Sequence, residues 1–427
     1  MLRPYFAVDL LAGYAENAYL CRREKLYIIV MSLRTAVIGG GAAGFFLAVN
    51  LKEMMPTMDV TILERSPRVL AKVAMSGGGR CNCTNTFRQV SDLSAVYPRG
   101  HRLLKRLFKV FSPTDAYAWF ERHGLPLTIQ DDECVFPQAQ DAQAVVGCFR
   151  TLARRYDVHV LTSHKVDSLR QLADYDFVAV TTGGSPTGQR LRWLADCGHE
   201  VEPPVPSLFS LTVGDEALHQ LMGLVVADAS VRLPATKLRA DGPLLITHWG
   251  LSGPAILRLS SYGARQLADH DYRMPLSVGW VALSETDVHD ALQMAVVRDA
   301  QRQLSTCNPL GLQQRLWNYL ADRALGERSH LRWSELGKKD LNRLTNILTN
   351  DTYQTHGRAP FKDEFVTCGG VSLRAVSATT LESRHVPRLY FAGEVLDIDG
   401  ITGGFNFQAA WTTAYVAASS IAEAAKR

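Results

Sequence analysis

The sequence predicts an α/β fold in which a discontinuous Rossmann-like domain is interrupted by an antiparallel β lobe and a helical lobe. Two observations carry this prediction. A strand, a glycine-rich turn, a helix and a second strand follow one another from Thr35, which is the order of a parallel sheet with helical crossovers. Further along, the hydrophobic pattern changes to short alternating runs, then to a helical period, and strand character returns near the C-terminus.

The Rossmann-like part is expected at both ends of the chain. Short β-rich apolar runs predict strands at 35–38, 59–63, 159–161 and 177–181, and a helical pattern at 44–54 separates the first two. Strands return at 365–367 and 389–392, and an Ala-rich helix follows from about Gln408 to the end. These segments are expected to complete one sheet.

The middle of the chain contains the two inserted lobes. From 203 to about 275, alternating runs at 208–213, 229–233 and 244–247 are broken by proline and glycine. From 284 to about 349, apolar residues recur at helical spacing. The division that we predict is 32–200 with 356–427 as the Rossmann-like domain, 201–283 as the β-rich lobe and 284–355 as the helical lobe.

The opening segment differs from the rest. Asp9 and Glu16 interrupt its apolar stretch, which disfavours a signal peptide, and Met31 comes immediately before the run 32–38 that contains the first predicted strand. We therefore expect the native protein to begin at Met31. This makes the opening segment, 1–31 in our division, a non-native or disordered extension.

Length and composition are those of an ordinary globular protein with several lobes. The chain has 427 residues, which at about 150 residues per domain predicts roughly three lobes. No apolar run approaches the roughly 18 residues of a membrane span, and the formal charge of +4 by itself gives nucleic-acid binding no support. We expect a cytoplasmic protein without integral membrane contact.

The eight cysteines predict neither a metal centre nor a redox disulfide. No C-x-x-C spacing occurs, and the closest pair, Cys81 and Cys83, is separated by one residue. A chain of this length can build a full core without disulfides. We expect reduced thiols, no metal and no dithiol relay.

A dinucleotide site is predicted by the run 39–44, which fits G-x-G-x-x-G with Gly39, Gly41 and Gly44 as its glycines. The run follows a strand, opens a helix, and is followed 20 residues after Gly44 by Glu64. Gly39 then allows the tight turn, Gly41 lets the backbone approach a pyrophosphate, and Gly44 packs helix against strand. Glu64 accepts hydrogen bonds from a ribose diol, which favours adenosine without a 2′-phosphate. An ordinary βα turn is the alternative.

Two further glycine clusters bear on whether the dinucleotide is FAD or NAD. The loop 76–85 places three glycines before Arg80, and successive glycines form an amide nest against an anion or a flavin edge. Near the C-terminus a strand ends at Glu394, and the run 400–406 leads into the last helix. Glycine at that helix start permits close approach of an isoalloxazine ring, whose reduced form the helix dipole stabilises. A flexible loop and a plain helix cap at Asn406 are the alternatives.

These motifs together resemble a known family. The chain is similar to the YhiN/BaiN-type NAD(P)/FAD-dependent oxidoreductases, also called aminoacetone oxidase-like flavoproteins, of the two-dinucleotide-binding-domain superfamily. The resemblance covers the chain from about Met31 to the end and rests on the runs 37–41, 77–85, 247–254 and 391–411. At 132–137 this chain departs from the family, because it has Glu-Cys where relatives often have Gly-Arg.

The resemblance implies FAD and a Rossmann-like FAD-binding domain with an inserted β-barrel-like lobe and a helical lobe. Activities in this group include reduction of an enone in bile-acid metabolism. The cofactor-binding residues that we expect are Gly39, Gly41, Ala42, Ala43, Gly44, Glu64, Arg65, Gly78, Gly79, Arg80, Cys81, Asn82, Thr84, Asn85, Val166, Thr182, Gly183, Gly393, Glu394, Asp397, Gly403, Gly404, Phe405 and Asn406.

A flavin donates and accepts hydride itself, so the protein has to position the substrate and manage protons. His248, between Thr247 and a glycine-rich turn, is the candidate proton donor because imidazole is the side chain that titrates near neutral pH. A structural histidine is the alternative.

Three functions stay open at this stage. The leading one is an FAD-dependent oxidoreductase of a small organic substrate, with NADH or NADPH docking transiently against the inserted lobes because a second G-x-G-x-x-G is absent. A second is an FAD-containing RNA-associated protein, for modification or regulation, although a solvated helix face explains the same charges. Its basic residues are Arg99, Arg102, Lys105, Arg106, Lys109 and the segment 301–345. A third is a non-catalytic flavin-binding scaffold. The oligomeric state is open.

Overall fold

The computed structural model describes residues 32–427 except 186, 235 and 360–365, and Leu33–Arg427 form one compact unit. The expectation for the opening segment, and the first residue of the strand expected at 365–367, lie outside the described residues. The remaining structure confirms the predicted fold class, a Rossmann-like α/β domain with a barrel-like insertion and helices.

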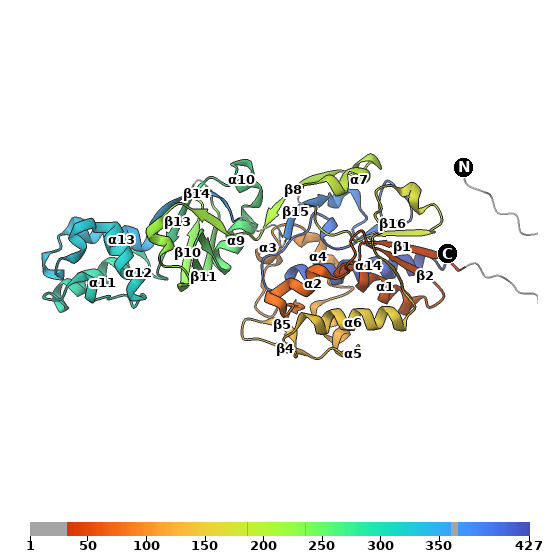
Figure 1. Ribbon diagram of the computed structural model, residues 1–427, viewed down its shortest axis with the longest axis horizontal. Helices are drawn as coiled ribbons and strands as arrows, with labels where there is room; N and C mark the ends of the chain where they lie inside the picture. The colour runs from red at the N-terminus through yellow and green to blue at the C-terminus, as the bar shows by residue number, and fades with distance from the viewer. Residues whose placement is uncertain (1–31, 186, 235, 360–365) are drawn as a thin grey trace, which may run out of the picture. The chain divides into compact units, whose positions relative to one another are not determined.

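The Rossmann-like domain is built on a five-stranded parallel sheet with the order β16-β7-β1-β2-β6 (Figure 1). Its strands are β1 (Arg34–Ile38), β2 (Asp59–Leu63), β6 (His159–Leu161), β7 (Phe177–Val180) and β16 (Leu389–Phe391). The last four residues of β1 are buried, as in a central parallel strand that is covered on both faces. β16 pairs with β7, so the strand predicted at 389–392 completes the sheet. The strand predicted at 365–367 does not, because Val366–Val371 pairs with Val201–Ser207 in a separate two-stranded sheet.

Two apolar helices form the centre of this domain. Helix α1 (Ala42–Met54) packs along α14 (Phe405–Ala424), and most residues of both are buried. Helix α6 (Ala142–Arg155) is amphipathic and covers α1 with its buried face. The aromatic rings of Phe46, Trp119 and Trp411 meet between these elements, with Phe46 4.4 Å from Trp119 and 5.1 Å from Trp411 between centroids.

A small antiparallel sheet and several short helices follow β2. The sheet has the order β3-β5-β4, and its strands are β3 (Thr84–Asn85), β4 (Leu127–Ile129) and β5 (Cys134–Pro137). The helices are α2 (Ala71–Met75), α3 (Leu93–Val96), α4 (His101–Leu107) and α5 (Pro113–Arg122). Helix α5 starts with a capping box between Ser112 and Asp115, which fixes its first turn.

The chain leaves the Rossmann-like domain through helix α7 (Arg192–Asp196) and strand β8 (Val201–Ser207), and it returns through β15 (Val366–Val371). β8 and β15 pair as an antiparallel two-stranded sheet. The outgoing and returning segments therefore lie side by side.

The inserted β lobe is a closed six-stranded barrel with the order β10-β11-β12-β9-β14-β13. Its strands are β9 (Leu211–Val213), β10 (Val225–Arg232), β11 (Arg239–Thr247), β12 (Gly250–Ser252), β13 (Pro275–Gly279) and β14 (Asp351–Arg358). Helices α8 (Glu216–His219), α9 (Pro254–Tyr262) and α10 (Ala264–Asp269) accompany the barrel. Closure leaves the barrel without free strand edges.

The helical lobe consists of α11 (Glu285–Arg298), α12 (Gln314–Leu325) and α13 (Lys338–Asn350). Its buried residues share one hydrophobic core with the barrel, including Trp280 from the barrel and Trp317 from α12. The predicted boundary at 355/356 falls inside β14, which is a barrel strand. We therefore propose that the return from the inserted lobes follows Arg358.

Three local expectations differ from the structure. Strand β9 starts at Leu211 rather than 208, because Leu208 has a positive φ of 59° that ends extended backbone. Helix α14 starts at Phe405, three residues before Gln408. Arg99 is not part of the α4 basic face, because it precedes the helix and its half-buried side chain pairs with the buried Asp399.

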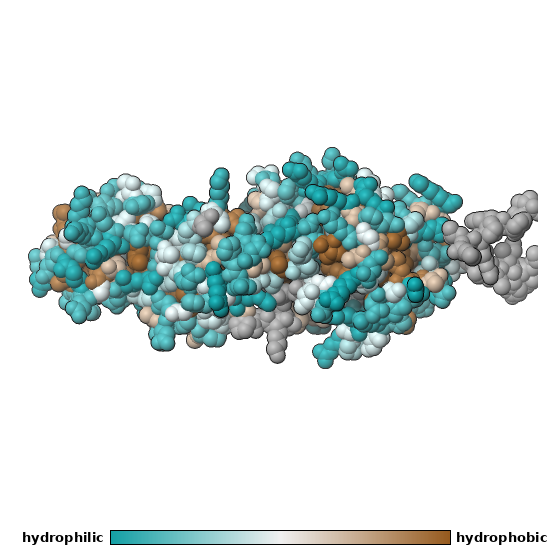
Figure 2. Space-filling model, turned by 90° about the horizontal axis from the view of Figure 1, so that it is seen from above, coloured by the Kyte–Doolittle hydropathy of each residue, from teal (hydrophilic) through white to brown (hydrophobic). Residues whose placement is uncertain are grey.

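No helix among the described residues is long and apolar enough to cross a membrane. The face shown in Figure 2 is mostly hydrophilic, with hydrophobic residues in separate patches. Among the described residues, Val297 and Met294 of α11 have the most exposed large hydrophobic side chains.

Candidate functional site

The predicted glycine turn lies between β1 and α1, at the carboxyl end of the parallel sheet. Gly39 has a φ of +113°, and a Cβ on it would lie 2.5 Å from the Thr181 carbonyl oxygen. A Cβ on Gly44 would overlap the Gly39 carbonyl oxygen. Both positions therefore require glycine, for the turn and for the contact between helix and strand.

Gly41 differs, because a Cβ there would meet no atom within 4 Å. Gly41 caps α1 through its backbone alone, since no side chain bonds to the helix start and the first turn has no acidic residue. The first N–H groups of a helix have no partner within it, and they form a binding site for phosphate. Nearby, the Thr182 hydroxyl oxygen is buried without a partner among the described residues. Open space, amide donors and an unpartnered hydroxyl fit the pyrophosphate of a dinucleotide.

Glu64 lies at the end of β2, beside the turn. One carboxylate oxygen accepts a hydrogen bond from the Gly40 N–H at 2.7 Å, and the other accepts from the Ser66 N–H and hydroxyl. The carboxylate is thus held at the turn, and the oxygen bonded to Gly40 can accept a further hydrogen bond, as from a hydroxyl group of a ribose. Arg65 is exposed next to it, and Val166 is half-buried in the loop after β6.

The second glycine cluster forms an exposed loop. Gly77, Gly78 and Gly79 all have positive φ, and a Cβ on Gly78 or Gly79 would meet no atom within 4 Å. The Arg80 guanidinium stacks on the Phe136 ring, 4.4 Å from its centroid. The loop therefore borders open space as expected, while the charge of Arg80 lies on the small antiparallel sheet.

The structure brings this loop to the start of α14. Thr84 donates its hydroxyl to Gln408 at 2.5 Å, and Asn85 donates its amide to the Gly403 carbonyl at 3.1 Å. In the amide orientation in which its nitrogen donates to the Thr84 carbonyl, the side-chain oxygen of Asn82 accepts a hydrogen bond from the Gly404 N–H at 3.1 Å. These polar side chains, expected to orient a flavin, join two motifs that are far apart in the sequence.

The C-terminal motif is also bound to protein partners. A Cβ on Gly404 would overlap the Thr84 carbonyl oxygen, so glycine here allows two backbones to approach. Asn406 lies inside α14 and bonds with both amide atoms to Gly400 at 2.8 Å, so it is not the helix cap. The Phe405 carbonyl accepts from the Tyr97 hydroxyl at 2.7 Å.

Gly393, Glu394 and Asp397 follow β16. A Cβ on Gly393 would lie 2.8 Å from the Cβ of Ala43, and a Cβ on Gly183 would lie 3.7 Å from a carboxylate oxygen of Glu394. This places Glu394 beside the first turn of α1. Asp397 instead pairs with Arg265 of α10 at 3.1 Å and accepts from the Gly369 N–H.

Cys81 and Cys83 are fully buried in the same loop, and all cysteines of the described residues are free thiols. The hydrogen bond between the two thiols lowers the pKa of Cys81 and raises the pKa of Cys83, which burial raises further. No cluster of metal-ligating side chains occurs in the described part of the chain.

His248 lies on the barrel, in the hairpin between β11 and β12. Its ring is exposed and contacts Trp249 at 4.2 Å between centroids. The structure does not bring it together with the glycine turn through any bond of the described residues. A role as proton donor stays a prediction.

Two cationic residues near the turn were missed by the sequence reasoning. Lys72 of α2 forms an ion pair with Glu394 at 3.0 Å. Arg190 follows β7, and burial lowers the pKa of its guanidinium, which the neighbouring charge of Arg65 lowers further. Neither residue belongs to a motif, so the sequence alone carried no signal for them.

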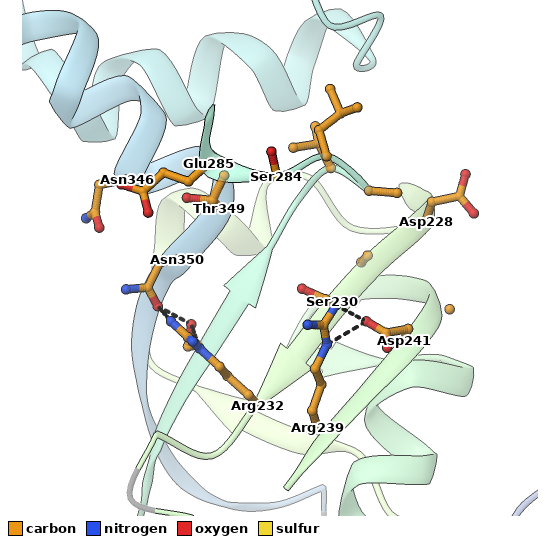
Figure 3. A pocket seen from close by; sticks show the side chains of 16 residues that line it. Asp228, Ser230, Arg232, Arg239, Asp241, Ser284, Glu285, Asn346, Thr349 and Asn350 are labelled. Carbon is orange, nitrogen blue, oxygen red and sulfur yellow. Dashed lines mark hydrogen bonds and ion pairs between the residues drawn. The ribbon is translucent and has the colours of Figure 1, made fainter. Parts of the chain in front are cut away.

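A polar cavity of about 660 Å³ lies in the inserted lobes, between barrel strands and the start of α11 (Figure 3). Arg232 in its lining bonds to Ser277 and Asn350, and Arg239 pairs with Asp241 at 2.9 Å. Asp228 and Glu285 add negative charge. Since both arginines already have partners, this cavity gives little support to docking of a nicotinamide dinucleotide.

The chain has clear relatives among known proteins. A family model described as "HI0933-like protein Rossmann domain" matches residues 33–420. The 3-dehydro-bile acid delta(4,6)-reductase of Clostridium scindens is 27% identical over 419 residues, covering 91% of this chain and 99% of that protein. The ribosomal RNA dihydrouridine synthases of Haemophilus influenzae and Escherichia coli are 26% and 28% identical, each covering 90% of this chain and 97% of the relative.

Proposed function

The chain belongs to the HI0933-like Rossmann-domain family, as its motifs predicted, and on this premise we propose that it is an FAD-dependent oxidoreductase. The observation that carries the proposal is the glycine turn, where Gly41 borders open space at the uncapped start of α1 and Glu64 is fixed beside it. This is the donor and acceptor set that an adenine dinucleotide requires.

The residues that would hold FAD fall into two groups. The amides at the start of α1 and the Thr182 hydroxyl bind phosphate, and Glu64 binds ribose. Gly78 and Gly79 leave room beside the loop that is joined to the start of α14. When bound, FAD supplies hydride transfer, so the chain itself orients the substrate and moves the proton, for which His248 is the candidate.

The names of the relatives support a reduction as the reaction. A 3-dehydro-bile acid delta(4,6)-reductase and a dihydrouridine synthase both saturate a C=C bond conjugated to a carbonyl. We propose the same bond type as the substrate class here, in a small organic molecule, with NADH or NADPH as the reductant. A proton donor near the substrate is needed because saturation adds one hydride and one proton.

The test is an anaerobic visible spectrum of the purified protein before and after addition of NADH or NADPH. We expect flavin bands that one of the two nucleotides bleaches, and reoxidation of the flavin by a conjugated enone. Free FAD with the same nucleotide is the control. Absence of flavin after reconstitution with FAD would contradict the proposal, and a flavin that neither nucleotide bleaches would contradict the reductant.

RNA is the second candidate substrate, favoured by helix α4. Arg102, Lys105 and Arg106 of α4 and Lys109 in the turn after the helix are all exposed, at i, i+3, i+4 and i+7 spacing. The opposite face, Leu103, Leu104 and Leu107, packs in one core with Ile398, Ile401 and Phe405. The apolar face of α4 therefore packs against the loop that leads into α14, and the cations lie on the opposite face of the same helix. In the segment 301–345, by contrast, Arg302, Arg323 and Arg328 are used in ion pairs.

The salt dependence of RNA binding tests this candidate. Each phosphate contact with single-stranded RNA contributes a slope of about −0.7 in log K against log salt. Replacing these four cations of α4 and the turn after it by Gln should reduce the slope by about 3, and should abolish uridine reduction in RNA but not enone reduction. The matched control replaces Arg298 and Arg302, which pair with Asp299 at the C-terminal end of α11. RNA binding with the same slope in both variants would contradict this role of α4.

A further inference from the structure

Lys72 is held at the edge of the glycine turn by the start of helix α2. The Leu70 N–H donates to the Gly40 carbonyl oxygen at 2.8 Å, and a Cβ on Gly40 would lie 2.8 Å from a methyl carbon of Val69. Leu70 caps α2 in the left-handed conformation, and Lys72 lies in the helical turn that follows. The position of the lysine is therefore fixed relative to the turn by backbone contacts.

The partner of Lys72 is fixed on the other side of the same turn. Glu394 accepts a hydrogen bond from the Thr367 N–H at 2.7 Å with one oxygen, and its other oxygen pairs with the Lys72 ammonium at 3.0 Å. Its neighbour Gly393 lies against Ala43 in the first turn of α1. The ion pair thus reaches from α2 to the segment beside the helix start.

Stability of the fold does not account for this ion pair. The side chains are 55% and 21% exposed, and an ion pair with this exposure contributes little to folding. Meanwhile the adjacent helix start has no acidic residue and no side-chain cap, and Gly41 borders open space. The Thr182 hydroxyl at the same edge has no partner among the described residues. A half-exposed cation beside unfilled donors matches a ligand with more than one negative charge.

We propose that Lys72 binds the pyrophosphate of FAD, and that Glu394 holds the ammonium at the site before FAD arrives. This inference rests on the proposed function. The amides of α1 and the ammonium then approach the two phosphates from different elements, and Glu394 is left with its bond to the Thr367 N–H. Lys72 is a binding residue in this role and takes no part in the reaction.

The experiment measures the affinity of full-length apoprotein for FAD and for ADP, which shares the pyrophosphate but lacks the flavin. Lys72→Met should weaken both ligands by the same factor, roughly ten-fold or more, since a charged hydrogen bond is lost. Lys72→Arg should stay within a few-fold of the wild type. The matched control is Lys339→Met on α13, which removes the same charge at an exposed site in the helical lobe and should change nothing.

A double variant separates direct contact from an effect through Glu394. If Lys72 only neutralises Glu394, Lys72→Met with Glu394→Gln will recover wild-type affinity, and this would overturn the proposal. We expect the double variant to bind no better than Lys72→Met. An unchanged affinity of Lys72→Met for FAD and ADP would also overturn the proposal that Lys72 binds the pyrophosphate. Wild-type protein that binds no FAD would instead contradict the proposed function. Unchanged thermal unfolding of the apoproteins excludes misfolding as the cause of any loss.

Discussion

At the scale of single residues, Gly41 separates binding of the cofactor from folding of the chain. Its φ of −93° and ψ of −166° suit any residue, and a Cβ would enter open space. Gly41→Val should therefore fold with a stability within about 0.5 kcal/mol of the wild type, as for an exposed substitution. Its branched side chain would occupy the place of the pyrophosphate and abolish FAD binding. Flavin content per protein and thermal unfolding of the apoprotein are the measurements.

Gly44→Ala is the matched control for that prediction. The added methyl group would overlap the Gly39 carbonyl oxygen, so this variant should lose stability and FAD together. A Gly41→Val protein that retains one FAD per chain would show that the pyrophosphate is not bound at this turn.

At the scale of elements, a buried ion pair joins three segments around the loop that leads into α14. Arg99 pairs with Asp399, which also accepts from the Ser207 hydroxyl, and Arg99 donates to the Ser261 carbonyl at the end of α9. Burial raises the pKa of Asp399, so its charged form depends on the guanidinium. Arg99→Met should therefore cost about 3–5 kcal/mol in the free energy of unfolding. Arg99→Met with Asp399→Leu should cost less, and an equal cost would contradict this assignment.

The cost of Arg99→Met should depend on pH. Without the guanidinium, the folded-state pKa of Asp399 rises further above its unfolded value. Such a group contributes stability at low pH and loses it as pH rises through the folded pKa. The variant should thus lie closer to the wild type in chemical denaturation at pH 5 than at pH 8. A deficit that is the same at both pH values would indicate loss of packing rather than a stranded charge.

Elements with a strong local pattern could be predicted from the sequence, and pairings between distant segments could not. The strands at 59–63 and 159–161 were predicted with their observed bounds, because these runs are short, rich in β-formers and bounded by polar residues, in a chain whose other elements already indicate an α/β order. Closure of the barrel depends on β14, which comes directly after the helical pattern of 284–349 and was assigned mostly to the helical lobe, because its residues carried no signal for pairing with β9 and β13. Strand register of this kind is set by tertiary packing.

The candidate site shows the same division. The glycine turn and Glu64 form a local motif, which the structure places together as predicted. Asn82, Thr84 and Asn85 were expected to orient a flavin, which stays a prediction, and their bonds to Gln408, Gly403 and Gly404 have no sequence signature. Lys72 was missed because a single lysine on a five-residue helix has no pattern, and its role depends on where Glu394 lies.

At the scale of the whole molecule, the hydrophobic interior is divided between the two parts of the chain. One core contains only residues between Phe209 and Tyr353, from the barrel and the helical lobe. Two others contain only residues from the segments before Val201 and after Val371, together with those two valines and the bordering Tyr262. Every residue assigned to FAD lies in or beside the two cores of the Rossmann-like domain, whereas His248 lies on the barrel. Binding of FAD should therefore stabilise one part of the molecule more than the other.

Calorimetry of the apoprotein with increasing FAD tests this division. A ligand present at 100 times its Kd stabilises the part that binds it by about 2.7 kcal/mol, which for a unit of roughly 240 residues raises Tm by about 5–10 °C. We expect two thermal transitions, of which FAD raises only the one that belongs to the Rossmann-like domain. Trp317→Ala, in the core of the inserted lobes, should lower the other transition by removing a buried ring worth about 3–5 kcal/mol. If FAD and Trp317→Ala instead shift one single transition, the two parts unfold as one cooperative unit. The paired strands β8 and β15 and the Arg99–Asp399 ion pair would then couple them.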